Sequence, residues 1–236
     1  MEFTFGIITA GSDLLKKVLS SIYSEMGRKK DFEIIVIGGS PFSFKNLTHI
    51  PFDETVKPDW ISKKKNIIAQ NAKYDNLVMM HDYYELLPGW YKGFVKFGSK
   101  WDICMTVIEN LDGTRYRDWV SWNDPEIGKL PEFRWMPQGV AWAPGTHHSP
   151  IAIVPYDYKK TENLLIDGGY WVCKKQVMLD YPINESRLRG QGEDIEWTKR
   201  VREKCTYRMN TFSKVKLLKY KLTQAKVVTY AEINYI

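Results

Sequence analysis

The sequence contains no long apolar run. No stretch of about 18 consecutive apolar residues occurs in it, so a membrane-spanning helix is not expected. The first residues, MEFTFGIITAG, lack the basic start and the cleavage site of a signal peptide, and we interpret them as a first strand. Internal repeats, linkers and low-complexity tracts are missing as well. With 236 residues, 44% of them hydrophobic, the chain is expected to fold as one domain with a sizeable core.

Cysteine is scarce, and its spacing follows no pattern. Cys104, Cys173 and Cys205 are odd in number and far apart in the sequence. They match neither a disulfide framework nor a zinc site, and this favours a reducing compartment. We therefore expect a cytoplasmic protein.

Nucleic-acid-binding motifs are missing too, although the chain is basic. The formal net charge is +6, but the cations are spread along the whole sequence, and no helix-turn-helix, zinc-finger or RNA-recognition motif occurs. A net charge of this kind indicates weak association with anions or acidic lipid. We expect no nucleic-acid partner, and no membrane contact beyond a weak peripheral one.

The first strand-to-helix turn, Thr9–Asp13, contains one glycine. It lacks the three glycines of a dinucleotide fingerprint and the GKS or GKT of a P-loop, so neither hydride transfer nor ATP hydrolysis is supported. A nucleotide lying close to the backbone is compatible with the turn, and Gly38-Gly39-Ser40 forms a second opening beside it. Any βα turn can have this form, so the turn alone does not decide between a structural and a binding role.

The first half of the sequence predicts an alternation of strands and helices. The expected strands are Phe3–Thr9, Phe32–Gly39, a weaker piece near His49–Phe52, a strand ending at Asp82, and Trp101–Val107. Helices are expected after Ser12, which we interpret as a cap, over Trp60–Ala72 and from about Trp90. This order predicts a parallel sheet with right-handed crossovers.

Residues 110–163 break this alternation. They are rich in tryptophan, proline and glycine without a clear period, which is typical of a lid or binding segment. Two interpretations remain open for the tryptophans, an acceptor-sugar platform or a small satellite core, and they concern Trp119, Trp122, Trp135 and Trp142. The last residues, Thr206–Ile236, indicate short strands or a mixed tail.

The segment with the most candidate functional side chains runs from Lys63 to Trp90. It contains a cationic helix and then an apolar strand with polar residues beyond it, in the order Lys63, Lys64, Lys65, Asn66, Asn76–Met80, His81, Asp82 and Glu85. In open α/β sheets, ligands lie outside the carboxyl ends of the strands. A carboxylate there, with an imidazole, suits a divalent ion that bridges two phosphates. The alternatives are a solvated lysine face and an aspartate that caps a loop.

A second candidate site is the acid pair Glu193 and Asp194, which follows Gly190-Gln191-Gly192 and begins a helix. Acidic residues are favourable in a first helical turn for structural reasons alone, but a carboxylate beside a sugar hydroxyl can also act as a general base. The helix N-terminus is expected to lower the pKa of such a base. His147 and His148 lack the HExxH spacing, yet either could ligate a metal once their loop closes.

Together these segments resemble the GT-A glycosyltransferases, especially the family 2-like branch. The resemblance covers most of the chain, through Thr9-Ala10-Gly11, Gly38-Gly39, the KKN helix with AKYDNLVMMHDYYELLPGW, and the downstream GGYW and GEDIEWTKR. It implies an α/β GT-A fold, with a mixed sheet flanked by helices in a single domain. A nucleotide-sugar half is expected over about 1–110 and a loop-rich acceptor half over about 111–236.

By position, the resemblance also implies roles for individual residues. Asp82 with His81 stands at the metal-binding DxD site, although His81-Asp82-Tyr83 is not a strict DxD and Glu85 has an unusual offset. Asp194, with Glu193 as second choice, stands at the site of the base. The donor site implied is Thr9, Ala10, Gly11, Gly39, Lys63, Lys64, Asn66 and Asp82, and the acceptor site is Gly169, Tyr170, Trp171 and Trp142.

The expected activity is that of a hexosyltransferase, which moves a sugar from a nucleoside-diphosphate donor to a hydroxyl of a carbohydrate or glycan acceptor. The resemblance implies an inverting displacement in which Mn²⁺ or Mg²⁺, with Lys63–Lys65, stabilises the leaving diphosphate. Two alternatives stay open. One is a nucleotidyltransferase, although ITAGSDLLKK lacks the second glycine and the arginine of that class. The other is a non-catalytic carbohydrate-binding protein, which nine tryptophans permit.

Overall fold

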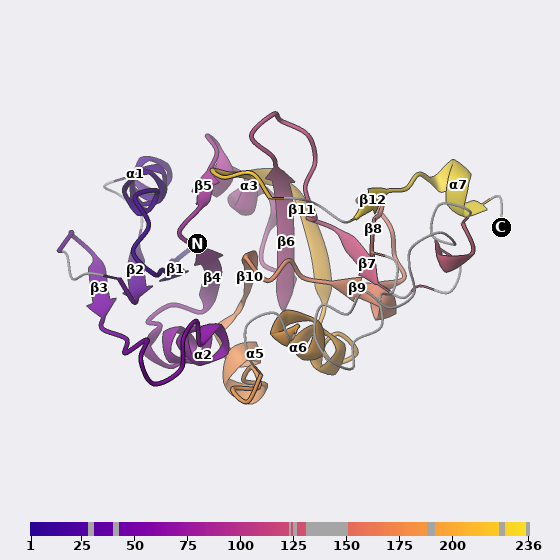
Figure 1. The fold of residues 1–236 in the computed structure, drawn as a ribbon. Helices are drawn as coiled ribbons and strands as arrows, with labels where there is room; N and C mark the ends of the chain where they lie inside the picture. Colours follow the sequence, from indigo (N-terminus) through magenta and orange to yellow (C-terminus); the bar gives the residue numbers. More distant parts are fainter. Residues whose placement is uncertain are drawn as a thin grey trace.

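The computed structural model describes residues 1–27, 31–39, 43–122, 124, 127–130, 151–187, 192–221 and 225–234. In this part the chain forms a central eight-stranded mixed sheet with helices on both sides (Figure 1). The strands of this sheet are β1 (Phe3–Ile8), β2 (Phe32–Ile37), β3 (Leu47–Ile50), β4 (Asn76–His81), β5 (Tyr84–Leu86), β6 (Ile103–Glu109), β10 (Tyr170–Lys174) and β11 (Tyr207–Leu217). The helices are α1 (Leu15–Met26), α2 (Ile61–Asn71), α3 (Trp90–Phe97), α5 (Lys175–Asp180), α6 (Glu193–Val201) and α7 (Tyr230–Asn234).

The order of the large sheet is β3-β2-β1-β4-β10-β6-β11-β5. The first four strands in this order are parallel, as the alternation of the sequence predicts. Strand β10 then lies antiparallel between β4 and β6, and β11 continues parallel to β6. Strand β1 is buried along its whole length, because helices cover both faces of the parallel block. The predicted α/β class with a mixed sheet is confirmed.

Helix α1 shows how the apolar spacing sets the packing. Leu15, Val18, Leu19 and Ile22 are buried against the sheet at intervals of three and four residues. The helix begins at Leu15, and no side chain caps it. Ser12, the predicted cap, forms the turn before it instead, since its Oγ accepts a hydrogen bond from the Leu14 backbone N–H at 3.1 Å.

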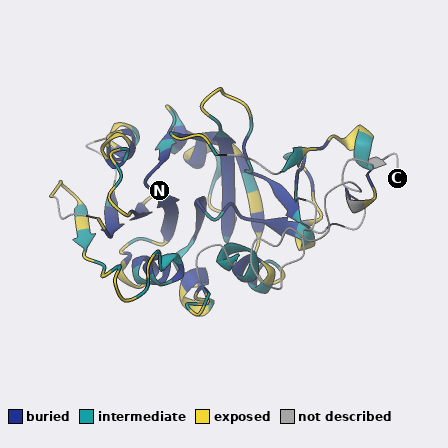
Figure 2. Ribbon diagram, in the orientation of Figure 1, coloured by how far each residue is buried: buried dark blue, intermediate teal, exposed yellow. Residues whose placement is uncertain are grey.

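A smaller four-stranded sheet stands beside the large one, in the order β12-β8-β7-β9. Its strands are β7 (Val120–Trp122), β8 (Ile151–Ile153), β9 (Leu164–Leu165) and β12 (Lys226–Val227). Part of the segment that the sequence presents as one long loop is therefore β-structure. The core runs through both sheets, and exposed residues gather on the outer turns of helices and on loops (Figure 2). None of the helices among the described residues is long and apolar enough to cross a membrane.

Candidate active site

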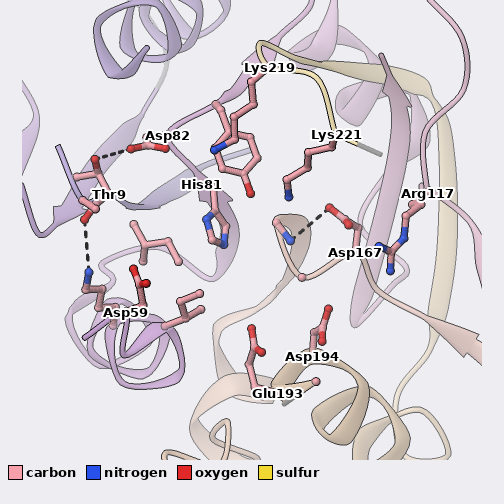
Figure 3. Close-up of a pocket in the computed structure, with 18 of the residues that line it drawn as sticks. Thr9, Asp59, His81, Asp82, Arg117, Asp167, Glu193, Asp194, Lys219 and Lys221 are labelled. Carbon is pink, nitrogen blue, oxygen red and sulfur yellow. Dashed lines mark hydrogen bonds between the residues drawn. The ribbon is translucent and has the colours of Figure 1, made fainter. Parts of the chain in front are cut away.

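A cavity of about 620 Å³ opens at the carboxyl ends of β1 and β4 (Figure 3). Parts of the chain that are far apart in sequence meet there, among them the β1–α1 turn, the start of α2, the end of β4, the turn before β10, the start of α6 and the segment after β11. The titratable residues that line it are Asp59, Lys64, His81, Asp82, Tyr83, Tyr116, Arg117, Asp167, Glu193, Asp194, Lys219 and Lys221. This is the sheet edge at which the sequence predicts a ligand.

The β1–α1 turn is tied directly to Asp82. Thr9 Oγ1 donates a hydrogen bond to Asp82 Oδ2 at 2.5 Å, and the Gly11 backbone N–H donates to Thr9 Oγ1 at 2.9 Å. Gly38 packs against this turn with φ +89°, and a Cβ atom at Gly38 would collide with the Thr9 carbonyl oxygen. Thr9, Ala10, Gly11 and Asp82 are thus brought together at one wall of the cavity, whereas Gly39 is not among the lining residues.

Two members of the predicted cationic cluster face away from the cavity. Lys63 Nζ forms an ion pair with Glu185 at 3.0 Å. Asn66 Nδ2 donates to Glu185 Oε1 and to the Ile183 carbonyl, each at 2.9 Å. Both residues fasten α2 to the chain before α6, and neither lines the cavity.

The other two lysines of the cluster are buried and paired. Lys64 lines the cavity, forms an ion pair with Glu54, and approaches the Thr9 carbonyl at 3.4 Å. Lys65 Nζ donates to the Gly168 carbonyl at 2.9 Å and lies 3.3 Å from Glu193 Oε1. Lys65 therefore contacts the predicted acid pair.

His81 is held at the end of β4 by its backbone N–H, which donates to the Gly169 carbonyl at 2.9 Å. Burial holds the pKa of His81 well below its usual value, and the neighbouring cations Lys65 and Lys221 lower it further. The imidazole is accordingly neutral near pH 7. Glu85, the other predicted metal ligand, forms an ion pair with Lys17 at 3.3 Å and does not line the cavity.

Asp194 projects from the first turn of α6 into the cavity (Figure 3). Its pKa is raised to about 6, chiefly by burial and then by the neighbouring Glu193 charge, while Lys65 lowers it. The expectation that the helix N-terminus lowers this pKa is wrong, because burial and like charge outweigh the helix dipole. A Cβ atom at Gly168 would collide with Asp194 Oδ2, so glycine permits this close approach of the β10 turn.

Asp167 is a site residue that the sequence reasoning missed. It is buried in the turn before β10, where Tyr84 Oη donates to its Oδ2 at 2.5 Å and the Gly169 backbone N–H donates to the same oxygen at 3.3 Å. Arg117 lies on the same side of the cavity, with an Nε that has no hydrogen-bond acceptor among the described residues. Asp167 could have been identified from its position directly before Gly168-Gly169. No sequence pattern pointed to Arg117.

Lys219 and Lys221 were also missed, because they lie in the tail whose pattern is irregular. Their Nζ atoms lie 3.8 Å and 4.6 Å from the centre of the Tyr83 ring. In Figure 3 both enter the cavity from the side opposite Glu193 and Asp194. Burial lowers the pKa of Lys221, and the charge of Asp167 opposes this effect.

Of the predicted acceptor residues, Gly169 lines the cavity, whereas the next two side chains lie in the core. Tyr170 Oη accepts a hydrogen bond from Trp90 Nε1 at 2.9 Å. Trp171 packs against Trp197, with ring centroids 6.0 Å apart. Trp142, His147 and His148 lie outside the described residues.

The tryptophans of the irregular segment differ from one another in their surroundings. Trp119 is buried in the core, with Nε1 3.4 Å from the Tyr158 carbonyl. Trp122 lines the cavity, and Lys199 Nζ lies 4.0 Å from the centre of its ring. Trp135 lies outside the described residues.

The donor set at Asp82 fits a metal ion poorly. No group of three or more His, Cys, Asp or Glu side chains in the described ranges is arranged to hold one. Asp82 is the single carboxylate at the end of β4, one of its oxygens already accepts from Thr9, and lysines surround the adjacent His81. A divalent ion prefers several oxygen ligands and gains little beside ammonium groups.

Comparison with known proteins gives matches at the level of structure only. No family model and no curated protein matches the sequence. The crystal structure of S. aureus TarS 1–349 in complex with UDP superposes with a TM-score of 0.58 at 12% identity, over 92% of this chain and 61% of that chain. The crystal structure of GalNAc-T7 with UDP, GalNAc and Mn²⁺ superposes with a TM-score of 0.61 at 15% identity, over 95% of this chain and 44% of that one.

The chain thus spans about 60% of the TarS 1–349 structures and less than half of the GalNAc-T7 structure. At these identities the likeness concerns the fold. Both neighbours are GT-A glycosyltransferases, and the parallel block β3-β2-β1-β4 followed by the antiparallel β10 gives the same kind of mixed sheet. The fold predicted from the sequence is confirmed: this chain has the GT-A fold of glycosyltransferases.

Proposed function

We propose that this protein is a glycosyltransferase, which moves a sugar from a nucleoside-diphosphate donor to a hydroxyl group of a carbohydrate or glycan acceptor. The observation that carries the proposal is the placement of Asp194, with a pKa of about 6, in a cavity that also contains the β1–α1 turn and Asp82. A cavity of about 620 Å³ is within the usual range for ligand sites and has room for a nucleotide sugar. Structural neighbours solved with UDP and UDP-GlcNAc support the choice of donor class.

The donor and the acceptor would occupy different sides of the cavity. The nucleoside would lie along Thr9, Ala10 and Gly11, where the backbone is accessible, with Asp59 and Lys64 beside it. The sugar would then point toward Asp194. Trp122, which also lines the cavity, would pack on the acceptor sugar, because carbohydrate C–H faces pack well on aromatic rings.

The transfer would be a single displacement with inversion. The acceptor oxygen forms a bond to the anomeric carbon while the bond from that carbon to the diphosphate oxygen breaks, and its electron pair leaves with the diphosphate. The acceptor proton moves to the Asp194 carboxylate. A pKa of about 6 leaves Asp194 mostly ionised at pH 7 and makes it a stronger base than an ordinary aspartate. Glu193, whose oxygen lies 3.3 Å from Lys65 Nζ, would help to set that pKa.

Metal assistance and a cytoplasmic location, both predicted from the sequence, remain predictions. In metal assistance, Asp82 and His81 would be the ligands, and Mn²⁺ or Mg²⁺ would supply electrostatic stabilisation of the leaving diphosphate. A cytoplasmic location rests on the unpatterned cysteines, and all three are free thiols in the structure.

The test combines binding and turnover on the wild-type protein. Thermal shift with UDP, GDP and CDP should give an increase in melting temperature with at least one of them, because a ligand that binds only the folded state stabilises it. The matching nucleotide sugar should then be consumed, with release of the nucleoside diphosphate, when a mixture of glycan acceptors is added. Wild-type protein that binds none of the nucleotides and consumes no donor would contradict the proposal.

A further inference from the structure

Two lysines in the segment after β11 reach the cavity, and no carboxylate in the described part of the chain lies within ion-pairing distance of either. We propose that Lys219 and Lys221 hold the donor diphosphate in the place that a divalent metal ion would take, so that donor binding needs no metal. This inference rests on the proposed function, since it concerns the diphosphate of that donor.

The first argument is the distribution of paired and unpaired cations. Each lysine of the α2 cluster has a carboxylate partner: Lys63 with Glu185, Lys64 with Glu54 and Lys65 with Glu193. By contrast, within the described ranges no carboxylate lies at ion-pairing distance from Lys219 or Lys221. Apart from Arg117, the positive charge available to a ligand is therefore just after β11, and not on α2 as the sequence predicts.

The second argument is position. Both ammonium groups lie over the ring of Tyr83, the residue directly after Asp82. The Leu218 backbone N–H donates to the Tyr83 carbonyl at 2.9 Å, so the tail is fixed beside the carboxyl end of β4. This is the sheet edge where a metal-bound diphosphate was expected, and two cations already stand there.

The third argument is electrostatic. Lys219, Lys221 and Lys64 line the same cavity as His81 and Asp82. Ammonium groups at this edge of the sheet disfavour a divalent cation beside Asp82 and favour a diphosphate. Lys221 is half-buried, so an anion there would interact with a partly desolvated charge, which strengthens the interaction.

The chemical consequence concerns the leaving group. When the bond from the anomeric carbon to the diphosphate oxygen breaks, the electron pair stays on the diphosphate and adds negative charge to it. Two ammonium groups stabilise that developing charge without taking up a proton. The acceptor proton goes to Asp194, as before, so the step balances without a metal.

The experiment is calorimetric titration of the wild-type protein with UDP, GDP and CDP and with the corresponding monophosphates, in EDTA and then in MnCl₂. The variants are Lys219→Ala, Lys221→Ala and the double variant. Lys100→Ala is the control, because Lys100 is an exposed lysine outside the lining residues of the cavity. Melting temperatures identify any variant that fails to fold, and Lys219→Met or Lys221→Met, which remove the charge but keep the length of the side chain, then serve in its place.

Wild-type affinity for the best-bound diphosphate should be the same in EDTA and in MnCl₂. The double variant should lose about tenfold to a hundredfold in diphosphate affinity, as expected for charge-assisted hydrogen bonds, with a smaller loss for the monophosphate and none for Lys100→Ala. Diphosphate binding that disappears in EDTA, or a double variant that binds as tightly as wild type, overturns the inference but leaves the glycosyltransferase proposal intact. Absence of binding to every nucleotide, together with absence of donor turnover, overturns both.

Discussion

At the scale of single residues, Asp194 is the group whose removal should separate chemistry from binding. Asp194→Asn keeps the shape but cannot accept the acceptor proton, so kcat should fall by about a hundredfold or more while donor affinity changes little. Glu196→Gln is the matched control, because Glu196 is on the same helix but pairs with Arg200 at 2.9 Å and does not line the cavity. Steady-state kinetics of both variants with one donor test this prediction. An unchanged kcat in Asp194→Asn would mean that the acid pair only stabilises the start of the helix.

The pH dependence of the same residue gives a second prediction. Only the ionised carboxylate can accept a proton, so kcat/KM should fall as the pH drops through about 6, the raised pKa of Asp194. Lys65 lowers that pKa, and Lys65→Met should therefore move the acid limb of the profile to higher pH. Lys63→Met is the control, since Lys63 pairs with Glu185 away from the cavity. An acid limb at the same pH in Lys65→Met and wild type would show that Lys65 does not act through Asp194.

Residue types at this site were predicted better than their environments. The sequence places Asp82 and Asp194 at the cavity because each follows a clear signal, the end of an apolar strand and a glycine turn before a helix. The pKa of Asp194 was predicted in the wrong direction, since burial depends on Gly168 and the turn before β10, which pack on it only in the folded chain. Lys63 and Lys64 are adjacent in sequence but differ in position. Lys63 pairs with Glu185 away from the cavity, whereas Lys64 pairs with Glu54 and lines the cavity.

At the scale of elements, the tryptophan-rich segment divides into core and cavity. Trp119→Ala should lower the free energy of unfolding by about 3–5 kcal/mol, because it removes a buried ring. Trp122→Ala should instead raise KM for the acceptor with little change in melting temperature, because Trp122 lines the cavity. The two variants control each other when denaturation and acceptor kinetics are measured on both. If Trp122→Ala loses as much stability as Trp119→Ala, its ring belongs to the core.

Most elements up to Glu109 follow from the sequence, although β5 was not predicted; after Glu109 the start of α6 was predicted, whereas the small sheet was not. Strands β1, β2 and β4 are buried on both faces, and their apolar runs identify them. Strand β11 is the longest, yet its burial alternates irregularly, and its pairing with β6 shifts between Asn210 and Lys214. A bulge of this kind disrupts the period of two by which a strand is recognised. The lysines after β11 were missed for the same reason.

At the scale of the whole molecule, the cavity joins distant parts of the chain, and a ligand should stabilise them together. Hydrogen exchange with and without UDP should show slower exchange for the amides of Gly11, His81, Gly169 and Leu218, which donate hydrogen bonds in or beside different walls of the site. The amides of β3, at the far edge of the sheet, serve as the internal control. Protection confined to Gly11 would mean that the nucleotide contacts only the β1–α1 turn.

The position of β10 has a consequence for biosynthesis. Strands β4 and β6 are both made before residue 110, but they are separated in the sheet by β10, which is made about sixty residues after β6 (Figure 1). While residues 110–169 are being synthesised, the edge of β4 has no partner from the strand that finally covers it. An open strand edge of apolar residues is a template for wrong pairing, so nascent chains that stop before Tyr170 should aggregate far more readily than chains that extend past Lys174.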